Sequence, residues 1–241
     1  MTESVFILAK MAANIYELEH SADEGKLNKD LENYKIIPSS IERGGMGCAC
    51  MGVYQCTTNS NVVLAIKGTS TTNATDILND ISLVLSGTIF NLLAGAAVGL
   101  TAAFLPAITI QKALYLKKTY GVNLITGHSL GGYMAEILAT QYNIRGIGFN
   151  APGTNGPTTK LGGAVVEGFH NVNAESDKIG NFNIVFVHHV QWSIYVPSSG
   201  SLLEKHSMAN MVDYFAKYPD ITNANIQARS KSYRTGYYYP K

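Results

Sequence analysis

The chain has 241 residues, of which 46% are hydrophobic and 15% are charged, and its formal net charge at pH 7 is +1. This length fits one α/β domain with a substantial core. A net charge so close to zero argues against a nucleic-acid partner, because it supplies no field that attracts phosphates. The charged fraction lies below the roughly 25% of typical soluble domains, which favours contact with lipid or membrane.

The N-terminal residues Met1–Ser4 lack the basic start of a secretory signal peptide, and Lys10 and Glu17 interrupt the apolar residues that follow. We therefore expect a protein that is cytoplasmic in the producing cell, or one that a signal-independent system exports. The three cysteines are Cys48, Cys50 and Cys56, with neither Cys-x-x-Cys spacing nor a nearby histidine. They are interpreted as small buried residues, so no metal site and no cofactor is expected.

The first predicted elements are a helix and a hairpin. Apolar residues recur at helical spacing from Val5 to Tyr16 and predict an amphipathic helix. The segment Ser21–Tyr34 is polar and is expected to be a surface connection. Two β-rich runs, Gly44–Cys56 and Val62–Ile66, flank turn-forming residues and predict a β-hairpin.

A run without charged residues extends from Ile81 to Ile110. It is long enough to cross a bilayer, but Ser, Thr, Asn, Gly and Pro residues interrupt it. This run has three possible interpretations: an apolar lid over an active site, a buried helical hairpin and a membrane span. We favour the lid. The sequence Gly95-x-x-x-Gly99 permits close helix packing under all three.

Helices and strands alternate after this run. Gln111–Tyr120 is expected to be a helix that ends at Gly121, a residue suited to a left-handed cap. Further strands are expected at 122–126, 146–150, 164–171 and 184–190, and further helices after Ser129 and over 205–217. This alternation predicts an α/β fold, with a central, mostly parallel sheet flanked by helices in a single domain over residues 1–241.

The most informative motif is Gly127-His128-Ser129-Leu130-Gly131, which has the form G-x-S-x-G. It follows the β-rich segment Val122–Thr126 and precedes the helix-forming segment Gly131–Tyr142. In this context the motif holds a nucleophilic serine on a sharp strand-to-helix turn. Ser129 is therefore the predicted nucleophile.

A serine nucleophile needs a base that takes its proton and an acid that orients the base. Folds with this motif place them in the chain order serine, acid, histidine. His206 follows a turn rich in Gly, Ser and Pro and begins an amphipathic helix, so it is the predicted base. Asp177 lies in a polar turn after the 164–171 strand and is the predicted acid, with Glu175 as the runner-up.

The other histidines receive different interpretations. His20 precedes the motif, and His128 is expected to point away from the neighbouring hydroxyl. His188 and His189 are adjacent in an expected strand, face opposite sides of the sheet and are interpreted as structural. His170 lies in a strand ahead of the acid candidate.

Two donors are predicted for the oxyanion that develops when the serine attacks a carbonyl group. The backbone N–H of Leu130 directly follows the nucleophile. Thr69 follows the apolar strand Val62–Ile66 and offers both a hydroxyl and an N–H. Loss of one such donor typically costs about 2.7 to 4 kcal/mol in the transition state.

These motifs together resemble the class 3 lipase family of α/β-hydrolases, which includes the fungal triacylglycerol lipases. The resemblance extends over roughly Val62 to Phe215 and is carried by Lys67-Gly68-Thr69, Asp80, the serine motif with Gly132, Asp177 and His206. It implies an α/β-hydrolase fold with a lid-like insertion at 81–110. It also implies a triad of Ser129, Asp177 and His206, and an oxyanion hole formed by Thr69 and Leu130.

The chain departs from the family pattern at several points. Lys67 replaces the usual arginine, and Ile77 replaces an aromatic residue that commonly precedes the aspartate. Secreted fungal members carry signal peptides and disulfides that this sequence does not show. Bacterial relatives include antibacterial lipase effectors delivered by type VI secretion, which lack such signals. Similarity to these effectors implies a cognate immunity protein as a partner.

The sequence thus predicts a metal-independent lipase or phospholipase that hydrolyses lipid acyl esters at a membrane or lipid interface. An alternative of a different class is a membrane-inserting or membrane-disrupting protein that acts through residues 81–110. A nearer alternative is a small-ester esterase or an acyltransferase that uses the same triad.

We expect Ala94→Glu to reduce cleavage of vesicle lipids more than cleavage of a short soluble ester. A charge in the 81–110 run would oppose its contact with lipid but would leave the chemistry of Ser129 intact. Initial rates on the two substrates measure the difference. Equal losses on both substrates would contradict the lid interpretation.

Overall fold

One mixed β-sheet organises the chain. The computed structural model describes residues 2–21, 23–45, 48–69, 100–154, 165–178, 180, 189, 191–226, 231–234 and 237–239. Within these residues the strands form a nine-stranded sheet in the order β1 to β9. The strands are β1 Tyr34–Ile36, β2 Met51–Cys56, β3 Val62–Ile66, β4 Leu124–His128, β5 Arg145–Phe149, β6 Phe169–Ala174, β7 Trp192–Val196, β8 Lys231–Arg234 and β9 Tyr237–Tyr239.

The centre of the sheet is parallel and its two edges are antiparallel. Strands β3, β4, β5, β6 and β7 pair in parallel, each with the next. Strands β1 and β2 join one edge and β8 and β9 the other, all through antiparallel pairs. The carboxyl ends of five central strands therefore meet along one edge of the sheet, where α/β folds build their sites.

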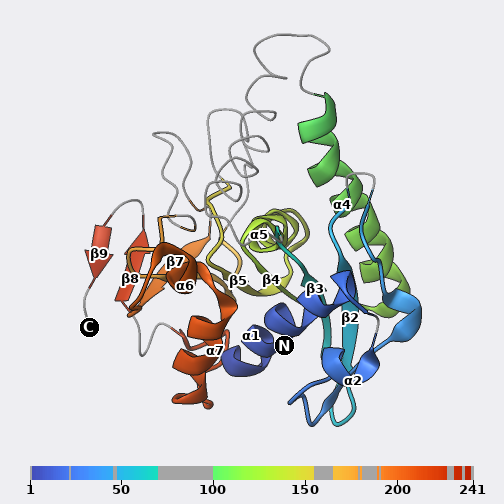
Figure 1. Cartoon of the computed structure of the whole chain (residues 1–241), viewed down its shortest axis with the longest axis horizontal. Helices are drawn as coiled ribbons and strands as arrows, with labels where there is room; N and C mark the ends of the chain where they lie inside the picture. The colour runs from blue at the N-terminus through green and yellow to red at the C-terminus, as the bar shows by residue number, and fades with distance from the viewer. Residues whose placement is uncertain are drawn as a thin grey trace.

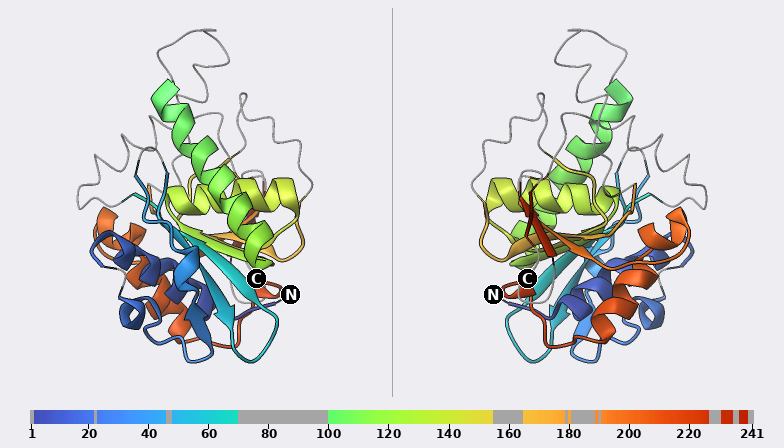
Figure 2. Two further views of the ribbon diagram at one scale, coloured as in Figure 1. Left: turned by 90° about the vertical axis from the view of Figure 1, so that its right-hand side faces the viewer. Right: turned by 90° about the vertical axis from the view of Figure 1, so that its left-hand side faces the viewer.

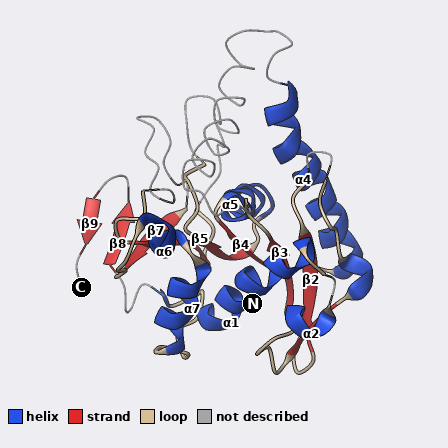
Figure 3. Ribbon diagram, viewed as in Figure 1, coloured by secondary structure: helices blue, strands red, loops and turns tan. Residues whose placement is uncertain are grey.

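Helices cover both faces of the sheet, as Figures 1 and 2 show. Helices α4 (Leu100–Tyr120) and α5 (Leu130–Tyr142) lie on one face, and α1 (Val5–Asn14) and α7 (Met208–Ala216) pack together on the other. Figure 3 shows the sheet as the layer between these two groups of helices. This arrangement confirms the predicted α/β class, with helices on both sides of a central parallel sheet.

Each face has its own hydrophobic core, and the alternation of side chains along the strands supplies both. In β3, Val63 and Ala65 belong to the core under α1, whereas Leu64 and Ile66 belong to the core under α5. Successive residues of a strand point to opposite faces, so an apolar run such as Val62–Ile66 is the pattern expected of a strand buried on both sides.

Shorter helices complete the described chain. They are η1 Ile15–Glu19, α2 Glu24–Leu27, η2 Pro38–Ser40 and α6 Leu202–His206. Helix α1 continues directly into η1, whose Tyr16 contacts His128 at the carboxyl end of β4. The polar segment 21–34, expected to be a connection, contains α2.

Most of the predicted elements are confirmed. The N-terminal helix and the hairpin of β2 and β3 are present, and α4 ends at Tyr120 before Gly121, whose φ is +69°. The strand expected at 164–171 begins only at Phe169. The expected 205–217 helix is wrong as one element, because Ser207 adopts an extended conformation, with φ −70° and ψ 149°, between α6 and α7.

Two expectations concern residues outside the described part of the chain. The expected strand 184–190 lies there except for His189, and strand β7, which the sequence did not predict, occupies 192–196 instead. Residues 81–99 of the charge-free run also lie there, while its last residues form the start of α4. Among the described helices, none combines the length and the hydropathy that a membrane span requires. The single-domain organisation over 1–241 stays a prediction.

Candidate active site

The Ser129 backbone has a conformation that few residues other than glycine adopt. Ser129 lies between β4 and α5 with φ +54° and ψ −124°, and its N–H donates to the Phe149 carbonyl at 2.9 Å. A Cβ on Gly131 would lie 2.2 Å from the Ile66 carbonyl oxygen, and a Cβ on Gly127 would lie 2.4 Å from the Gly131 oxygen. The two glycines of the motif thus permit the sharp turn that presents Ser129.

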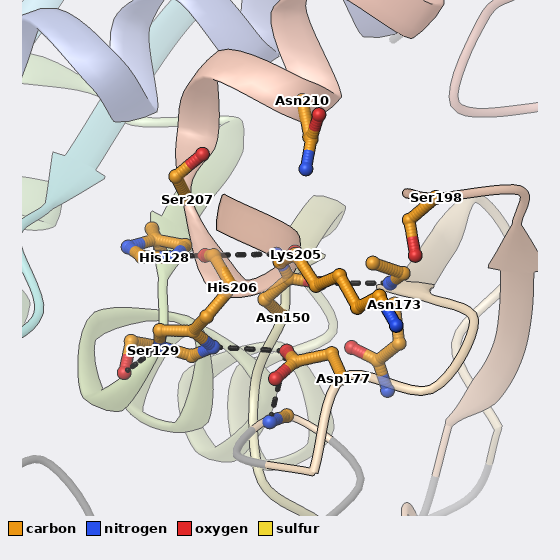
Figure 4. A network of polar contacts seen from close by, with 12 residues as sticks. His128, Ser129, Asn150, Asn173, Asp177, Ser198, Lys205, His206, Ser207 and Asn210 are labelled. Atoms are coloured by element: carbon orange, nitrogen blue, oxygen red, sulfur yellow. Dashed lines mark hydrogen bonds and ion pairs between the residues drawn. The ribbon is translucent and has the colours of Figure 1, made fainter. Parts of the chain in front are cut away.

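The three predicted triad side chains are brought together, as Figure 4 shows. His206 Nε2 lies 3.0 Å from Ser129 Oγ, and His206 Nδ1 lies 2.9 Å from Asp177 Oδ2. The three residues are buried, with relative exposures of 1% for Ser129, 3% for His206 and 0% for Asp177. In this geometry the Nδ1–H donates to the carboxylate and the hydroxyl donates to Nε2.

A short turn positions Asp177 after β6. The Asp177 N–H donates to the Ala174 carbonyl at 3.1 Å, and Ser176 between them has φ +63°. The Gly180 N–H donates to Asp177 Oδ2 at 3.0 Å, the same oxygen that contacts His206. Two donors therefore converge on one carboxylate oxygen, which fixes the orientation of the acid. The runner-up Glu175 lies at the start of this turn, half-buried.

Helix α6 positions His206 at its last residue. Ser201 and Glu204 form a capping box at the start of this helix, with the Ser201 N–H donating to Glu204 Oε2 at 2.6 Å. The helix ends at His206 because the backbone of Ser207 is extended, so His206 projects from the end of the helix. The last carbonyls of a helix lack intrahelical donors and need partners from elsewhere.

Asn150 supplies such partners, although the sequence did not single it out. Its Nδ2 donates to the carbonyls of Lys205 at 3.2 Å and His206 at 3.0 Å, and its Oδ1 accepts from the Ala174 N–H at 2.8 Å. Asn150 thus joins the end of α6 to the turn that carries Asp177 (Figure 4). Its place directly after strand β5 was the one available signal, since sites gather at these strand ends.

His128 points away from the Ser129 hydroxyl, as expected, and has a definite set of contacts. Its Nδ1 lies 2.7 Å from the Tyr16 hydroxyl and its Nε2 lies 2.7 Å from the His206 carbonyl oxygen. Burial and the neighbouring His206 ring lower the pKa of His128 to about 3. His128 is therefore neutral at physiological pH.

The two oxyanion candidates lie beside Ser129. Ile66 of β3 pairs with Gly127 of β4, so the loop after β3 and the nucleophile turn leave the sheet side by side. Thr69 and Leu130 both line a pocket of about 420 Å³, together with Lys67, Gly68 and Glu19. The buried Lys67 Nζ lies 2.5 Å from Glu19 Oε1, which anchors this loop to the end of η1. Asp80 and Ile77 lie outside the described residues.

The remaining histidines that the structure describes have other surroundings. His189 Nδ1 contacts Glu136 Oε2 of α5 at 2.8 Å, and burial lowers the pKa of His170 to about 4. His188 falls outside the described residues. Where the structure describes the chain, no group of three or more metal-ligating side chains occurs.

The three cysteines are free thiols near β2. Cys56 is buried in that strand and Cys50 is buried just before it, whereas Cys48 is half-buried and lines the pocket beside Thr69. Burial raises the pKa of the Cys50 thiol.

Comparison with solved structures identifies the fold. The chain superposes on nonglycosylated Lip2 lipase of Yarrowia lipolytica with a TM-score of 0.52 and 15% identity, covering 81% of this chain and 82% of that one. A fungal lipase in complex with an inhibitor gives a TM-score of 0.51 and 14% identity, covering 80% and 78%. A triacylglycerol lipase of Penicillium expansum gives 0.50 and 17%, covering 83% and 80%.

The sequence comparisons match no family model and no curated protein. At identities of 14 to 17% the structural likeness shows a shared fold, and that fold is the predicted α/β-hydrolase fold.

Buried His170 is expected to lower the free energy of unfolding at acid pH. We expect His170→Gln to weaken this dependence of stability on pH. Its folded-state pKa of about 4 lies below the ordinary value of 6.5, so between these values the unfolded chain binds a proton that the folded chain excludes. The free energy of unfolding therefore falls as pH drops from 6.5 toward 4, and removal of this histidine should lower the slope by up to about 1.4 kcal/mol per pH unit.

Urea unfolding at a series of pH values across this window measures the slope. His20→Gln, at an exposed position, controls for the substitution itself. Identical slopes for the wild type and His170→Gln would contradict the prediction.

Proposed function

We propose that this protein is a serine-dependent lipase that hydrolyses carboxylic esters of lipid acyl chains. The observation that carries the proposal is the position of His206, whose two ring nitrogens contact Ser129 Oγ at 3.0 Å and Asp177 Oδ2 at 2.9 Å. A hydroxyl, an imidazole and a carboxylate in this order form the arrangement that activates a serine nucleophile.

The proposed reaction proceeds through an acyl-enzyme. Ser129 Oγ attacks the ester carbonyl carbon while its proton passes to His206 Nε2, and Asp177 stabilises the resulting imidazolium. The oxyanion accepts hydrogen bonds from the Leu130 N–H and from Thr69. His206 then returns the proton to the leaving alcohol, and a water deprotonated by His206 releases the carboxylic acid and restores Ser129.

Two observations support a lipid as the substrate. The solved structures that superpose on this chain include that of a triacylglycerol lipase. The run Ile81–Ile110 has no charged residue, which suits a segment that covers an acyl site in water and contacts lipid at an interface. A phospholipase A-type activity on membrane lipids is the more specific form of this proposal.

The biological setting belongs to the same proposal. We infer a bacterial effector that is cytoplasmic in its producing cell, is exported by a non-classical secretion system and is neutralised by a cognate immunity protein. Lipid is its substrate, and nucleic acid is not a partner, since the net charge is +1.

Ser129→Ala should abolish ester hydrolysis while the fold is retained. We expect a loss of at least about 10⁴-fold in kcat, because the nucleophile and its proton are removed together. Mass spectrometry of lipids incubated with the protein identifies the released fatty acid and its source, phospholipid or triglyceride. Exposed Ser199 lies in the loop before α6, and Ser199→Ala is the matched control.

This experiment also separates the alternatives. Full membrane damage by Ser129→Ala would support a membrane-disrupting protein that acts through residues 81–110 and would contradict the lipase. Cleavage of short esters alone would identify an esterase, and transfer of the acyl group to an alcohol would identify an acyltransferase.

Asp177→Asn should leave the protein folded yet reduce kcat by roughly 10³- to 10⁴-fold. The amide donates where the carboxylate accepts, so it favours the His206 tautomer whose Nε2 carries a proton and cannot take one from Ser129. Steady-state rates on a short ester measure the loss. Asp213→Asn, at an exposed position of α7, is the control. Near-normal turnover by Asp177→Asn would remove this residue from the triad.

A further inference from the structure

We propose that Tyr16 and His128 are positioning residues that hold the base His206 from its backbone side and join it to the oxyanion loop. This inference rests on the proposed hydrolase function and adds to it two side chains that lie outside the triad. Neither touches the Ser129 hydroxyl in the described contacts, so their effect passes through His206 and through the loop after β3.

The contacts form a continuous chain from η1 to the base. The Tyr16 hydroxyl lies 2.7 Å from His128 Nδ1, and His128 Nε2 lies 2.7 Å from the carbonyl oxygen of His206. The rings of His128 and His206 lie 4.8 Å apart between centroids. His128 is 6% exposed and His206 is 3% exposed, so water does not readily replace either contact.

The chemistry of these contacts allows one assignment of protons. A carbonyl only accepts, so His128 Nε2 must carry the proton that it donates to His206. A neutral imidazole then has an unprotonated Nδ1, which accepts the proton of the Tyr16 hydroxyl. Burial raises the pKa of Tyr16, which keeps this hydroxyl a donor, and the low pKa of His128 keeps its ring neutral. Tyr16 thereby selects the His128 tautomer that can hold the base.

The same hydroxyl reaches the oxyanion loop. The Tyr16 hydroxyl lies against Gly68, the neighbour of Thr69. A Cβ on Gly68 would lie 2.8 Å from this oxygen and 2.9 Å from Ser129 Cβ, so the loop, the tyrosine and the nucleophile are in close contact. Tyr16 therefore joins two parts of the site that must keep a fixed separation during the reaction, the oxyanion donor and the base.

The position of His206 explains why it needs this support. It is the last residue of a short helix, and its carbonyl accepts from both His128 Nε2 and Asn150 Nδ2, at 2.7 Å and 3.0 Å. The Asp177 carboxylate fixes the imidazole ring, whereas these two donors fix the backbone from which the ring extends. Loss of either would let the ring shift from Ser129 Oγ.

Kinetics of a hydroxyl deletion tests the proposal. We expect Tyr16→Phe to lower kcat on a short p-nitrophenyl ester by about five- to twentyfold with KM changed less than about twofold, because the substrate contacts remain. Tyr54→Phe is the matched control, since Tyr54 is a buried tyrosine whose hydroxyl donates to the Leu27 carbonyl at 3.2 Å, away from the site. Equal kcat values for the two variants would overturn the positioning role.

Substitution of His128 provides the second arm. The side-chain amide of His128→Gln can still donate to the His206 carbonyl and should retain more activity than His128→Leu, which cannot. Equal losses in Gln and Leu variants of matched melting temperature would overturn the role of this contact.

The tautomer of His128 is measured separately, by ¹⁵N NMR of the wild-type imidazole. We expect a protonated Nε2 and an unprotonated Nδ1 from about pH 5 to pH 8. A protonated Nδ1 would overturn the chain of contacts whether or not the protein cleaves esters. Absence of all ester cleavage by the wild type, with the expected tautomer, would instead contradict the proposed hydrolase function.

Discussion

The strained turn at Ser129 is the constraint on which the rest of the site depends. Its φ of +54° directs the side chain above the carboxyl edge of the sheet while its N–H donates to Phe149 of the next strand. Such a conformation persists only where the surroundings over-determine it. Here the strands on either side of β4 hold the turn in place. Phe149 of β5 accepts from the Ser129 N–H, and the carbonyl of Ile66 on β3 lies so close to Gly131 that no side chain would fit there.

Parallel pairing then decides which residues can meet the nucleophile. Thr69, Asn150 and Asp177 follow β3, β5 and β6, and all three strands end at the edge where Ser129 emerges. His206 is the exception, because it comes from a helix end and has no strand to fix it. Its carbonyl is accordingly held by two side chains, His128 and Asn150, that belong to or follow central strands. The same rigid sheet therefore positions both the base and the nucleophile.

Periodicity and motif chemistry predict part of the site, whereas the residues that act through tertiary contacts leave no local pattern in the sequence. Ser129 was recognisable because its glycines are a local requirement of the turn, and His206 because the chain order of this chemistry is fixed. The roles of Asn150 and Tyr16 were not recognisable. Asn150 acts through hydrogen bonds to backbone groups of α6 and β6, and Tyr16 acts through a hydrogen bond to the His128 ring. Neither residue type has a local sequence pattern that marks such contacts. The break at Ser207 was missed because the apolar spacing continues across it.

The neutrality of His128 follows from the same geometry and has a consequence for the chemistry. When His206 takes the proton of Ser129 it becomes a cation, with its ring centroid 4.8 Å from that of His128. A charged His128 at this distance would oppose the imidazolium, and proximity of the two rings is one cause of its lowered pKa. Of the two histidines, His206 contacts the Asp177 carboxylate, at 2.9 Å, whereas His128 contacts a hydroxyl and a carbonyl. Two adjacent histidines therefore have separate tasks because one has a carboxylate partner and the other has neutral partners.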